Sequence, residues 1–245
     1  MQKPPNKKRW EEIVDFWDKG IGEEGDVRHK LVINPIVFEF LGDMTGKLVL
    51  DAGCGNGYLS RRMANKAKKV VAVDFTEGLI EKAKNRSKDY SNIEYKVGNV
   101  ESMDLHDRTF DVTLCNMVLM DLEHIDKAIE ELARVTKIAG RMVISTQHPC
   151  FENAHKDYPL RDVKTNEIGR VVTDYFTQGL VVDKYEGFPH YHWTLSSYLN
   201  AFSVNNLYLD EVKEPNNKEL LGEKMTEVVR NHTPMFIIFK LKRLG

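Results

Sequence analysis

The sequence has 245 residues, of which 42% are hydrophobic and 29% are charged, a composition ordinary for a globular protein and a length that allows one large domain or two small ones. Its 35 basic and 37 acidic residues give a net charge of −2, which excludes strong binding to nucleic acid by phosphate neutralisation alone. No apolar run approaches the ~18 residues of a membrane span, and the basic start of the chain leads into no signal-peptide core, so a cytoplasmic protein without a membrane partner is expected.

Apolar residues near the start of the chain recur at helical spacing. One face of a predicted helix carries four of them, Trp10, Ile13, Val14 and Trp17. A second helix is predicted from Asn34 to Leu41, with Pro35 in its first turn. Residues 1–45 are therefore expected to form a helical cap ahead of the core.

From residue 46 to residue 147, predicted strands and helices alternate. The strands are expected at Leu48–Asp51, Val70–Val73, Ile93–Val97, Phe110–Cys115 and Arg141–Ser145. The helical stripes between them are Leu59, Met63, Ala64 and Ala67, then Leu79, Ile80 and Ala83 after a cap at Thr76, and last Ile125, Ile129, Leu132 and Ala133. Such alternation predicts an α/β fold, a Rossmann-like doubly wound and mostly parallel sheet with helices on both faces.

The stretch from residue 148 to residue 193 interrupts this alternation and is too long for an ordinary loop. It is expected to be an insert that serves as a substrate lid. Residues 194–245 are predicted to complete the sheet with a helix capped by Thr194 and an antiparallel strand pair, Leu207–Val212 and Phe236–Leu241, at the sheet edge. The whole chain is thus predicted to be a single domain.

Three glycines separate the first predicted strand from the helix that follows, in the run Asp51-Ala52-Gly53-Cys54-Gly55-Asn56-Gly57. Glycines at this place allow a tight turn and a close approach of ligand. No Gly-Lys-Ser/Thr follows to hold phosphates, and the spacing differs from that of a dinucleotide-binding loop. Asp51 would also repel a pyrophosphate, so the site suits a positively charged ligand.

S-adenosylmethionine fits this requirement because it carries an ammonium and a sulfonium. Its ribose needs a hydrogen-bond acceptor at the end of the next strand, roughly 20 residues on. Asp74 stands at that position. The pair Asp51 and Asp74 therefore predicts an S-adenosylmethionine site.

Residues 46 to 148 resemble the class I S-adenosylmethionine-dependent methyltransferases of small-molecule type. Four segments in register carry the resemblance: Leu48 to Gly57, Val71 to Asp74, Phe110 to Leu119 and Arg134 to Ile144. The resemblance implies cofactor contacts at Asp51, Gly53, Cys54, Gly55, Asp74, Phe75, Asn99, Val100, Glu101, Asn116 and Met117. Two departures are Gly98-Asn99-Val100-Glu101 in place of a frequent Gly-Asp, and Ile138-Ala139-Gly140 in place of a Pro-Gly-Gly turn.

The acceptor side is expected from the cap and the insert. Trp17 and His29 lie in the region that similar methyltransferases fold over the cofactor, although simple packing competes as an interpretation for Trp17, as it does for Met117. In the insert, three residues are predicted to line an aromatic and histidine-rich acceptor pocket: His190, Tyr191 and His192. Their spacing is a poor fit to a metal site, so no metal is expected.

The predicted reaction is in-line methyl transfer to a small-molecule acceptor that the sequence does not identify. If the acceptor is a hydroxyl or a protonated amine, His148, just past the fifth strand, is the first candidate for its base. Two other functions stay open, a non-catalytic S-adenosylmethionine-binding module and a nucleotide-dependent oxidoreductase. A monomer or homodimer is expected, and the three cysteines, Cys54, Cys115 and Cys150, are predicted to be small buried residues.

Overall fold

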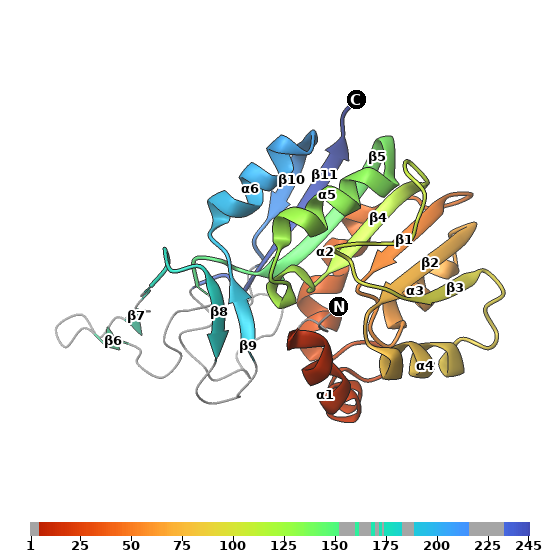
Figure 1. The fold of residues 1–245 in the computed structure, drawn as a ribbon, viewed down its shortest axis with the longest axis horizontal. Coiled ribbons are helices and arrows are strands. Elements are labelled where there is room, and N and C mark those ends of the chain that lie inside the picture. The colour runs from red at the N-terminus through yellow and green to blue at the C-terminus, as the bar shows by residue number, and fades with distance from the viewer. Residues whose placement is uncertain are drawn as a thin grey trace.

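The computed structural model describes residues 5–151, 160–161, 168–169, 172, 174–182, 189–215 and 233–245. Its main sheet has seven strands: β1 (Leu48–Ala52), β2 (Lys69–Asp74), β3 (Ile93–Val97), β4 (Phe110–Asn116), β5 (Thr136–Gln147), β10 (Leu207–Lys213) and β11 (Phe236–Arg243). Their order in space is β10-β11-β5-β4-β1-β2-β3 (Figure 1). Only β11 in this sheet runs against the others, since it pairs antiparallel with both of its neighbours.

Helices cover both faces of the sheet (Figure 1). They are α1 (Pro5–Ile21), α2 (Asn34–Leu41), α3 (Tyr58–Ala64), α4 (Glu77–Arg86), α5 (Ile125–Val135) and α6 (Leu195–Val204), with a π-helical turn η1 (His29–Ile33) and a 3-10 turn η2 (Leu119–Asp121). Helices α5 and α6 pack on one face, and α2 and α3 pack on the other. The predicted fold class, a doubly wound and mostly parallel α/β sheet, is confirmed.

The two apolar cores follow from the alternation of side chains along each strand. Leu50 and Ile144 are fully buried in the core beneath α5 and α6. Their neighbours in sequence, Val49 and Val143, are fully buried in the core beneath α2 and α3. Because both faces of the sheet are covered, the strands appear in the sequence as continuous apolar runs rather than as alternating patterns.

Two element boundaries differ from the prediction. Helix α3 ends at Ala64, so Ala67 lies beyond it, although its side chain is still buried. The turn expected at Gly140 is a bulge within β5, which starts at Thr136 and therefore begins earlier than predicted. The register with β4 shifts within this stretch, and Ala139 adopts a φ of +61° there.

The start of α4 is capped by a residue from another helix. Thr76 occupies the N-cap position as predicted, but its side chain makes no capping hydrogen bond. Instead, the Glu11 carboxylate of α1 accepts hydrogen bonds from Glu77 N at 2.8 Å and from Gly78 N at 3.4 Å. The Thr76 prediction was wrong in this respect because a charged group from α1 meets the positive end of the α4 dipole.

The late strands form the antiparallel pair that the sequence predicts, with β11 lying between β5 and the edge strand β10. In the 148–193 region, β6 (Leu160–Arg161) pairs with β7 (Ile168–Gly169), and β8 (Gly179–Val182) pairs with β9 (Pro189–His192). The β8–β9 hairpin and α1 lie toward the same end of the sheet, the lower end in Figure 1.

Two further predictions concern the membrane and the cysteines. Among the residues that the structure describes, no helix combines the length and apolar character needed to cross a membrane. Cys54 and Cys115 are buried, as predicted, whereas Cys150 is only partly buried. All three carry free thiols.

Candidate active site

A cavity of about 390 Å³ opens at the carboxyl ends of β1, β2 and β4. Ten of the predicted cofactor residues line it: Asp51, Gly53, Cys54, Gly55, Asp74, Phe75, Asn99, Val100, Asn116 and Met117. Three of the predicted acceptor residues, Trp17, His29 and His190, line it as well. Open α/β sheets bind their ligands at this edge, so the cavity is the candidate active site.

Asp51 is the next-to-last residue of β1, and its side chain is buried. The Ser60 hydroxyl of α3 donates a hydrogen bond to Asp51 Oδ2 at 2.5 Å. Burial, with a smaller contribution from the neighbouring Asp74, raises the pKa of Asp51 to about 7 against the effect of that hydrogen bond. A positive group beside Asp51 would therefore stabilise its charged form.

Asp74, the last residue of β2, holds the glycine loop, residues 53–57, in place. Its Oδ2 accepts a hydrogen bond from Gly55 N, and its Oδ1 accepts one from Thr76 N, each at 2.9 Å. Burial raises the pKa of this carboxyl, although the two backbone hydrogen bonds oppose the rise. Each carboxylate oxygen can accept more than one hydrogen bond, so both retain acceptor capacity.

Gly53 is a position that only glycine satisfies. Its φ is +78°, and a Cβ built on it would lie 2.2 Å from Val118 Cγ2. The same Cβ would lie 3.2 Å from Val118 Cβ, so rotation of the valine side chain cannot remove the whole overlap. The glycine loop therefore packs directly against the segment that follows β4.

Replacing Gly53 with alanine is expected to lower the free energy of unfolding by about 2 kcal/mol, because overlap in a packed region and a left-handed backbone both cost energy. Denaturant unfolding measures the change. The double variant with Val118→Ala should recover part of the loss, since it removes the overlapping methyl groups. Unchanged stability of Gly53→Ala would contradict this packing.

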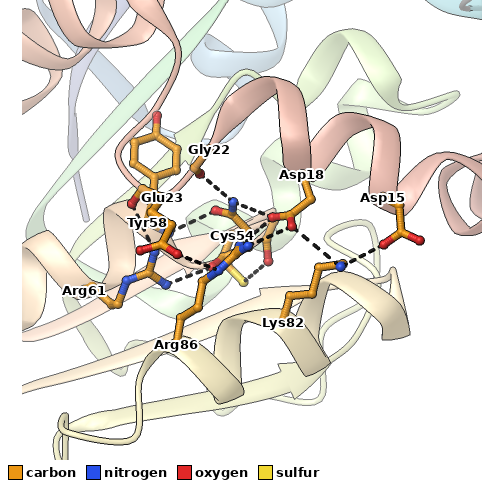
Figure 2. Close-up of polar contacts among 11 residues, drawn as sticks. Asp15, Asp18, Gly22, Glu23, Cys54, Tyr58, Arg61, Lys82 and Arg86 are labelled. Carbon is orange, nitrogen blue, oxygen red and sulfur yellow. Dashed lines mark hydrogen bonds and ion pairs between the residues drawn. The ribbon is translucent and has the colours of Figure 1, made fainter.

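Helix α1 is tied to the glycine loop and to α4 through one carboxylate, that of Asp18 (Figure 2). Arg86 of α4 donates two hydrogen bonds to Asp18, at 2.5 and 2.8 Å. Asn56 Nδ2 of the glycine loop donates to Asp18 Oδ1 at 2.9 Å and to Gly22 O at 2.8 Å. The hydrogen bond from Arg86 is the main reason that the pKa of Asp18 falls to about 2. A largely buried ion pair thus positions three elements of the site at once.

Two further cations complete this corner in Figure 2. Arg61 donates to Asn56 O at 2.9 Å and to Glu23 O at 3.1 Å, which holds the bend after α1 against the glycine loop. Lys82 of α4 forms an ion pair with Asp15 of α1 at 2.8 Å, where the Asp15 side chain is 93% exposed. The hydrogen bonds of Arg61 are at least partly buried, whereas the ion pair between Lys82 and Asp15 lies largely in solvent. The exposed ion pair therefore contributes less to stability.

Trp17 lies directly on the glycine loop. A Cβ added to Gly55, whose φ is +53°, would come within 2.7 Å of Trp17 Cη2. The Trp10 ring meets Trp17 edge to face at 5.7 Å, and both indoles line the cavity. Trp17 therefore combines the two roles that the sequence left as alternatives, packing against the core and lining the pocket.

His29 enters the cavity wall from the π-helical turn η1, a type of turn that often occurs at functional sites. Its Nδ1 lies 2.9 Å from Asp26 Oδ1, and its backbone N–H donates to the same oxygen at 2.8 Å. Burial raises the pKa of Asp26, but the hydrogen bonds from His29 outweigh it and lower the pKa to about 2. The orientation of the imidazole is thus fixed.

At the β3 end of the site, Asn99 and Val100 line the cavity, whereas Glu101 is not among the described residues that do so. The Asn99 amide donates to Glu101 Oε2 at 3.3 Å, and Asn99 Oδ1 accepts from Glu101 N at 3.0 Å. Glu101 Oε1 also accepts from His124 N at 3.1 Å. Glu101 therefore positions Asn99 and the start of α5 rather than facing the cavity.

At the β4 end, Asn116 and Met117 lie where the strand leaves the sheet. Ser145 Oγ of β5 donates to Asn116 Oδ1 at 2.8 Å. Met117 N donates to Ser145 O at 2.9 Å, and Met117 adopts a φ of +57°, which is unusual for a residue with a side chain. These contacts hold both side chains at the cavity wall.

The insert supplies only one of its three predicted residues to the cavity. His190 lines it, but Tyr191 and His192 are not among the described lining residues. Both are buried, and His192 Nε2 lies 2.7 Å from Tyr175 O. The Tyr175 hydroxyl accepts a hydrogen bond from Leu195 N. His192 and Tyr175 together therefore support the start of α6.

His148 follows β5 as predicted, yet it is not among the described residues of the cavity wall. Its Nε2 lies 2.5 Å from Glu214 Oε1, and its Nδ1 accepts a hydrogen bond from Cys150 N at 3.2 Å. Its side chain is 3% exposed. Both ring nitrogens are thus engaged outside the cavity, which leaves a base role without support from this geometry.

Several wall residues were missed by the sequence analysis, above all Asp121, Gln147 and Thr76. Asp121 had a usable signal, because it is an acid that interrupts an apolar run just past a predicted strand. Gln147 ends β5, one residue before the predicted His148. The sequence pattern around Thr76 indicates only a helix cap.

A methyltransferase domain model matches residues 44–178, more than half of the chain. The chain is 30% identical over 142 residues to a ubiquinone biosynthesis O-methyltransferase of Coxiella burnetii, across 56% of this chain and 59% of that protein. It is 34% identical over 101 residues to a malonyl-[acyl-carrier protein] O-methyltransferase of Serratia marcescens, across 41% of this chain and 38% of that protein. The chain thus spans about three fifths or less of the length of these relatives.

Solved structures share the fold. A methyltransferase structure from Mesorhizobium loti superimposes with a TM-score of 0.77 at 21% identity and covers 91% of this chain and 100% of the other. One from Listeria monocytogenes gives a TM-score of 0.74 at 23% identity, over 84% of this chain and 94% of the other. Together with the matched domain model, the acidic strand ends and the glycine loop, these findings place the chain in the class I S-adenosylmethionine-dependent methyltransferases, a family of enzymes whose methyl donor is S-adenosylmethionine.

Proposed function

We propose that this chain transfers a methyl group from S-adenosylmethionine to a small molecule with an apolar, ring-bearing body. The observation that carries the proposal is the continuity of one cavity. Its floor carries Asp51, Asp74 and the glycine loop, and helix α1 adds a wall of apolar side chains, Trp10, Ile13, Phe16, Trp17 and Ile21. A cofactor and a hydrophobic acceptor can therefore meet in one place without crossing solvent.

The polar groups of the cavity fit S-adenosylmethionine. Asp51 provides a buried acid for the ammonium group, and Asp74 retains acceptor capacity for ribose hydroxyls. The Thr76 hydroxyl in the same wall is fully buried and adds a further polar group beside Asp74. Asn99 supplies a side-chain amide near the β3 end.

The protein's own part in the reaction is positioning. S-adenosylmethionine, when bound, supplies a methyl group activated by a sulfonium. Asp51, Asp74 and the glycine loop hold the donor, while the indoles of α1 cover it and exclude water. Transfer then needs an acceptor atom in line with the methyl group, and no nucleophilic side chain is required.

The acceptor class is inferred from the wall and from the names of relatives. The relatives from Coxiella burnetii and Serratia marcescens are named O-methyltransferases, and a third relative, 30% identical over 138 residues, is named demethylmenaquinone methyltransferase. His190 and Gln147 are polar groups in the otherwise apolar wall. They are suited to orient a hydroxyl or carbonyl of the acceptor.

Affinity for S-adenosylmethionine is expected to fall as the pH drops from about 8 to 6. Burial raises the pKa of Asp51 to about 7, so below that pH its carboxyl is neutral and attracts the ammonium group weakly. Binding near pH 7 should also release protons, which calorimetry in two buffers of different ionisation enthalpy detects. The Asp51→Asn variant should lose this part of the pH dependence. An affinity that stays constant over the range would contradict the role of Asp51.

The proposed function is tested in two steps. Calorimetry should detect binding of S-adenosylmethionine and of its demethylated product, S-adenosylhomocysteine. Radiolabelled S-adenosylmethionine is then offered with pools of phenols and carboxylic acids, and a labelled organic product is expected. Binding without transfer to any pool would favour a non-catalytic binding module, and preferential binding of NAD would favour an oxidoreductase.

A further inference from the structure

Asp121 places a third acid in the cavity. It is the last residue of η2, and its backbone N–H donates to Val118 O at 2.8 Å, which fixes the turn after β4. The residues on either side of it, Met120 and Leu122, are buried and line the same cavity. A carboxylate beside such apolar side chains loses part of its hydration, so a positive charge that a ligand brings into the cavity stabilises it.

The charges around Asp121 make a cationic partner favourable. Burial raises the pKa of Asp121 to about 8, and the nearby Asp74 carboxylate adds to the rise. Burial also raises the pKa of Asp51 and of Asp74. Asp51, Asp74 and Asp121 line one cavity, and a cation that occupies it stabilises the charged form of each. Arg9 and His29 are basic residues of the wall, both from the N-terminal part of the chain.

The order of the strands brings these acids to adjacent positions. Asp51 and Asp74 belong to the neighbouring strands β1 and β2, and Asp121 follows β4, which pairs with β1 on its other side. In S-adenosylmethionine, the sulfonium joins the amino-acid part to the ribose. With the ammonium at Asp51 and the ribose at Asp74, as proposed above, a bound sulfonium would lie between these two contacts, in the cavity that Asp121 also lines.

We propose that Asp121 is a specificity-determining residue that favours the cationic donor over its neutral product. This inference rests on the proposed function. On methyl transfer, the bond between sulfur and the methyl carbon breaks and its electron pair stays on sulfur, while a lone pair of the acceptor atom forms the new bond to the methyl carbon. An anionic acceptor becomes neutral in this step, and a neutral acceptor passes its proton to solvent. The sulfur is then uncharged and its attraction to Asp121 is lost. Asp121 therefore promotes the exchange of product for fresh donor.

The test compares two ligands, S-adenosylmethionine and S-adenosylhomocysteine, by calorimetry at pH 9, where the Asp121 carboxyl is mostly ionised. Asp121→Asn is expected to weaken binding of S-adenosylmethionine about 10- to 100-fold, as is typical of a lost charge pair in a buried site, and to change binding of S-adenosylhomocysteine less than about threefold. Asp126→Asn, which removes an exposed acid of α5, is the matched control and should change neither affinity.

A pH series adds a measurement that a merely structural role does not affect. In the unmodified protein, the preference for S-adenosylmethionine over S-adenosylhomocysteine should grow as the pH rises through about 8, whereas in Asp121→Asn this growth should be absent. Equal weakening of both ligands by Asp121→Asn, or no change in either, overturns the inference. If the unmodified protein binds neither ligand, it is the proposed function that fails.

Discussion

Replacement of Asp74 by alanine is expected to weaken binding of S-adenosylmethionine by about 100-fold or more. Each charge-assisted hydrogen bond to a ribose hydroxyl contributes about 1.5–3 kcal/mol, and two such bonds are lost. The change also releases Gly55 N and Thr76 N, which the carboxylate now holds at 2.9 Å each, so the glycine loop loses its fixed position. Calorimetry measures the affinity, and circular dichroism checks that the variant is folded.

Asp74→Asn is the control for this experiment. It has nearly the same shape and keeps one oxygen acceptor, but its amide nitrogen cannot accept a hydrogen bond from either backbone N–H. Its affinity should therefore lie between those of the unmodified protein and Asp74→Ala. A folded Asp74→Ala protein that binds S-adenosylmethionine normally would show that the ribose is held elsewhere.

Loss of the Asp18 carboxylate is expected to be the most damaging change to stability among the variants considered. Asp18→Ala removes the partner of Arg86 and Asn56, in a contact where the Asp18 side chain is 9% exposed. Removal of one member of a largely buried ion pair costs about 3 kcal/mol, which in a chain of this size lowers the melting temperature by roughly 6–12 °C. Thermal unfolding at neutral pH measures it.

Two comparisons separate this ion pair from a general charge effect. Asp15→Ala, on the same helix, removes an ion pair to Lys82 in which the acid is almost fully exposed, and it should leave stability nearly unchanged.

The second comparison is the pH dependence of stability. The hydrogen bond from Arg86 lowers the pKa of Asp18 to about 2, so the contribution of Asp18 to the free energy of unfolding is complete above pH ~4 and is lost as the pH falls through 2. The difference between the unmodified protein and Asp18→Ala should therefore shrink in acid. A constant difference would contradict the ion pair as its cause.

Much of the fold follows from local sequence patterns. The runs that form β1 and β2 are mostly apolar and carry an acid at or next to their last position, and the stripe of Ile125, Ile129 and Leu132 has the spacing of a helix with one buried face. Their positions place Asp51 and Asp74 at one edge of a parallel sheet. The cofactor side of the site could therefore be predicted from residue spacing.

The remaining features depend on contacts between distant segments. Glu11 caps α4 from another helix, and Glu214 engages His148 across 66 positions of sequence, so neither contact has a local pattern. The π-helical turn that presents His29 has no periodic signature of its own. Asp121 is a single acid in an apolar run past a predicted strand, and the turn η2 after that strand brings it to the same cavity as Asp74.

The position of β11 has a consequence for how the molecule is assembled. This strand lies between β5 and β10, yet it follows both of them in the chain. During synthesis, β5 and β10 are therefore made before the strand that joins them, and each leaves an unpaired edge until β11 arrives. Pairings between such distant segments form slowly, and open strand edges invite association with other chains. Folding on the ribosome is thus expected to leave this half of the sheet incomplete, and to need protection from aggregation, until residues 236–243 have emerged.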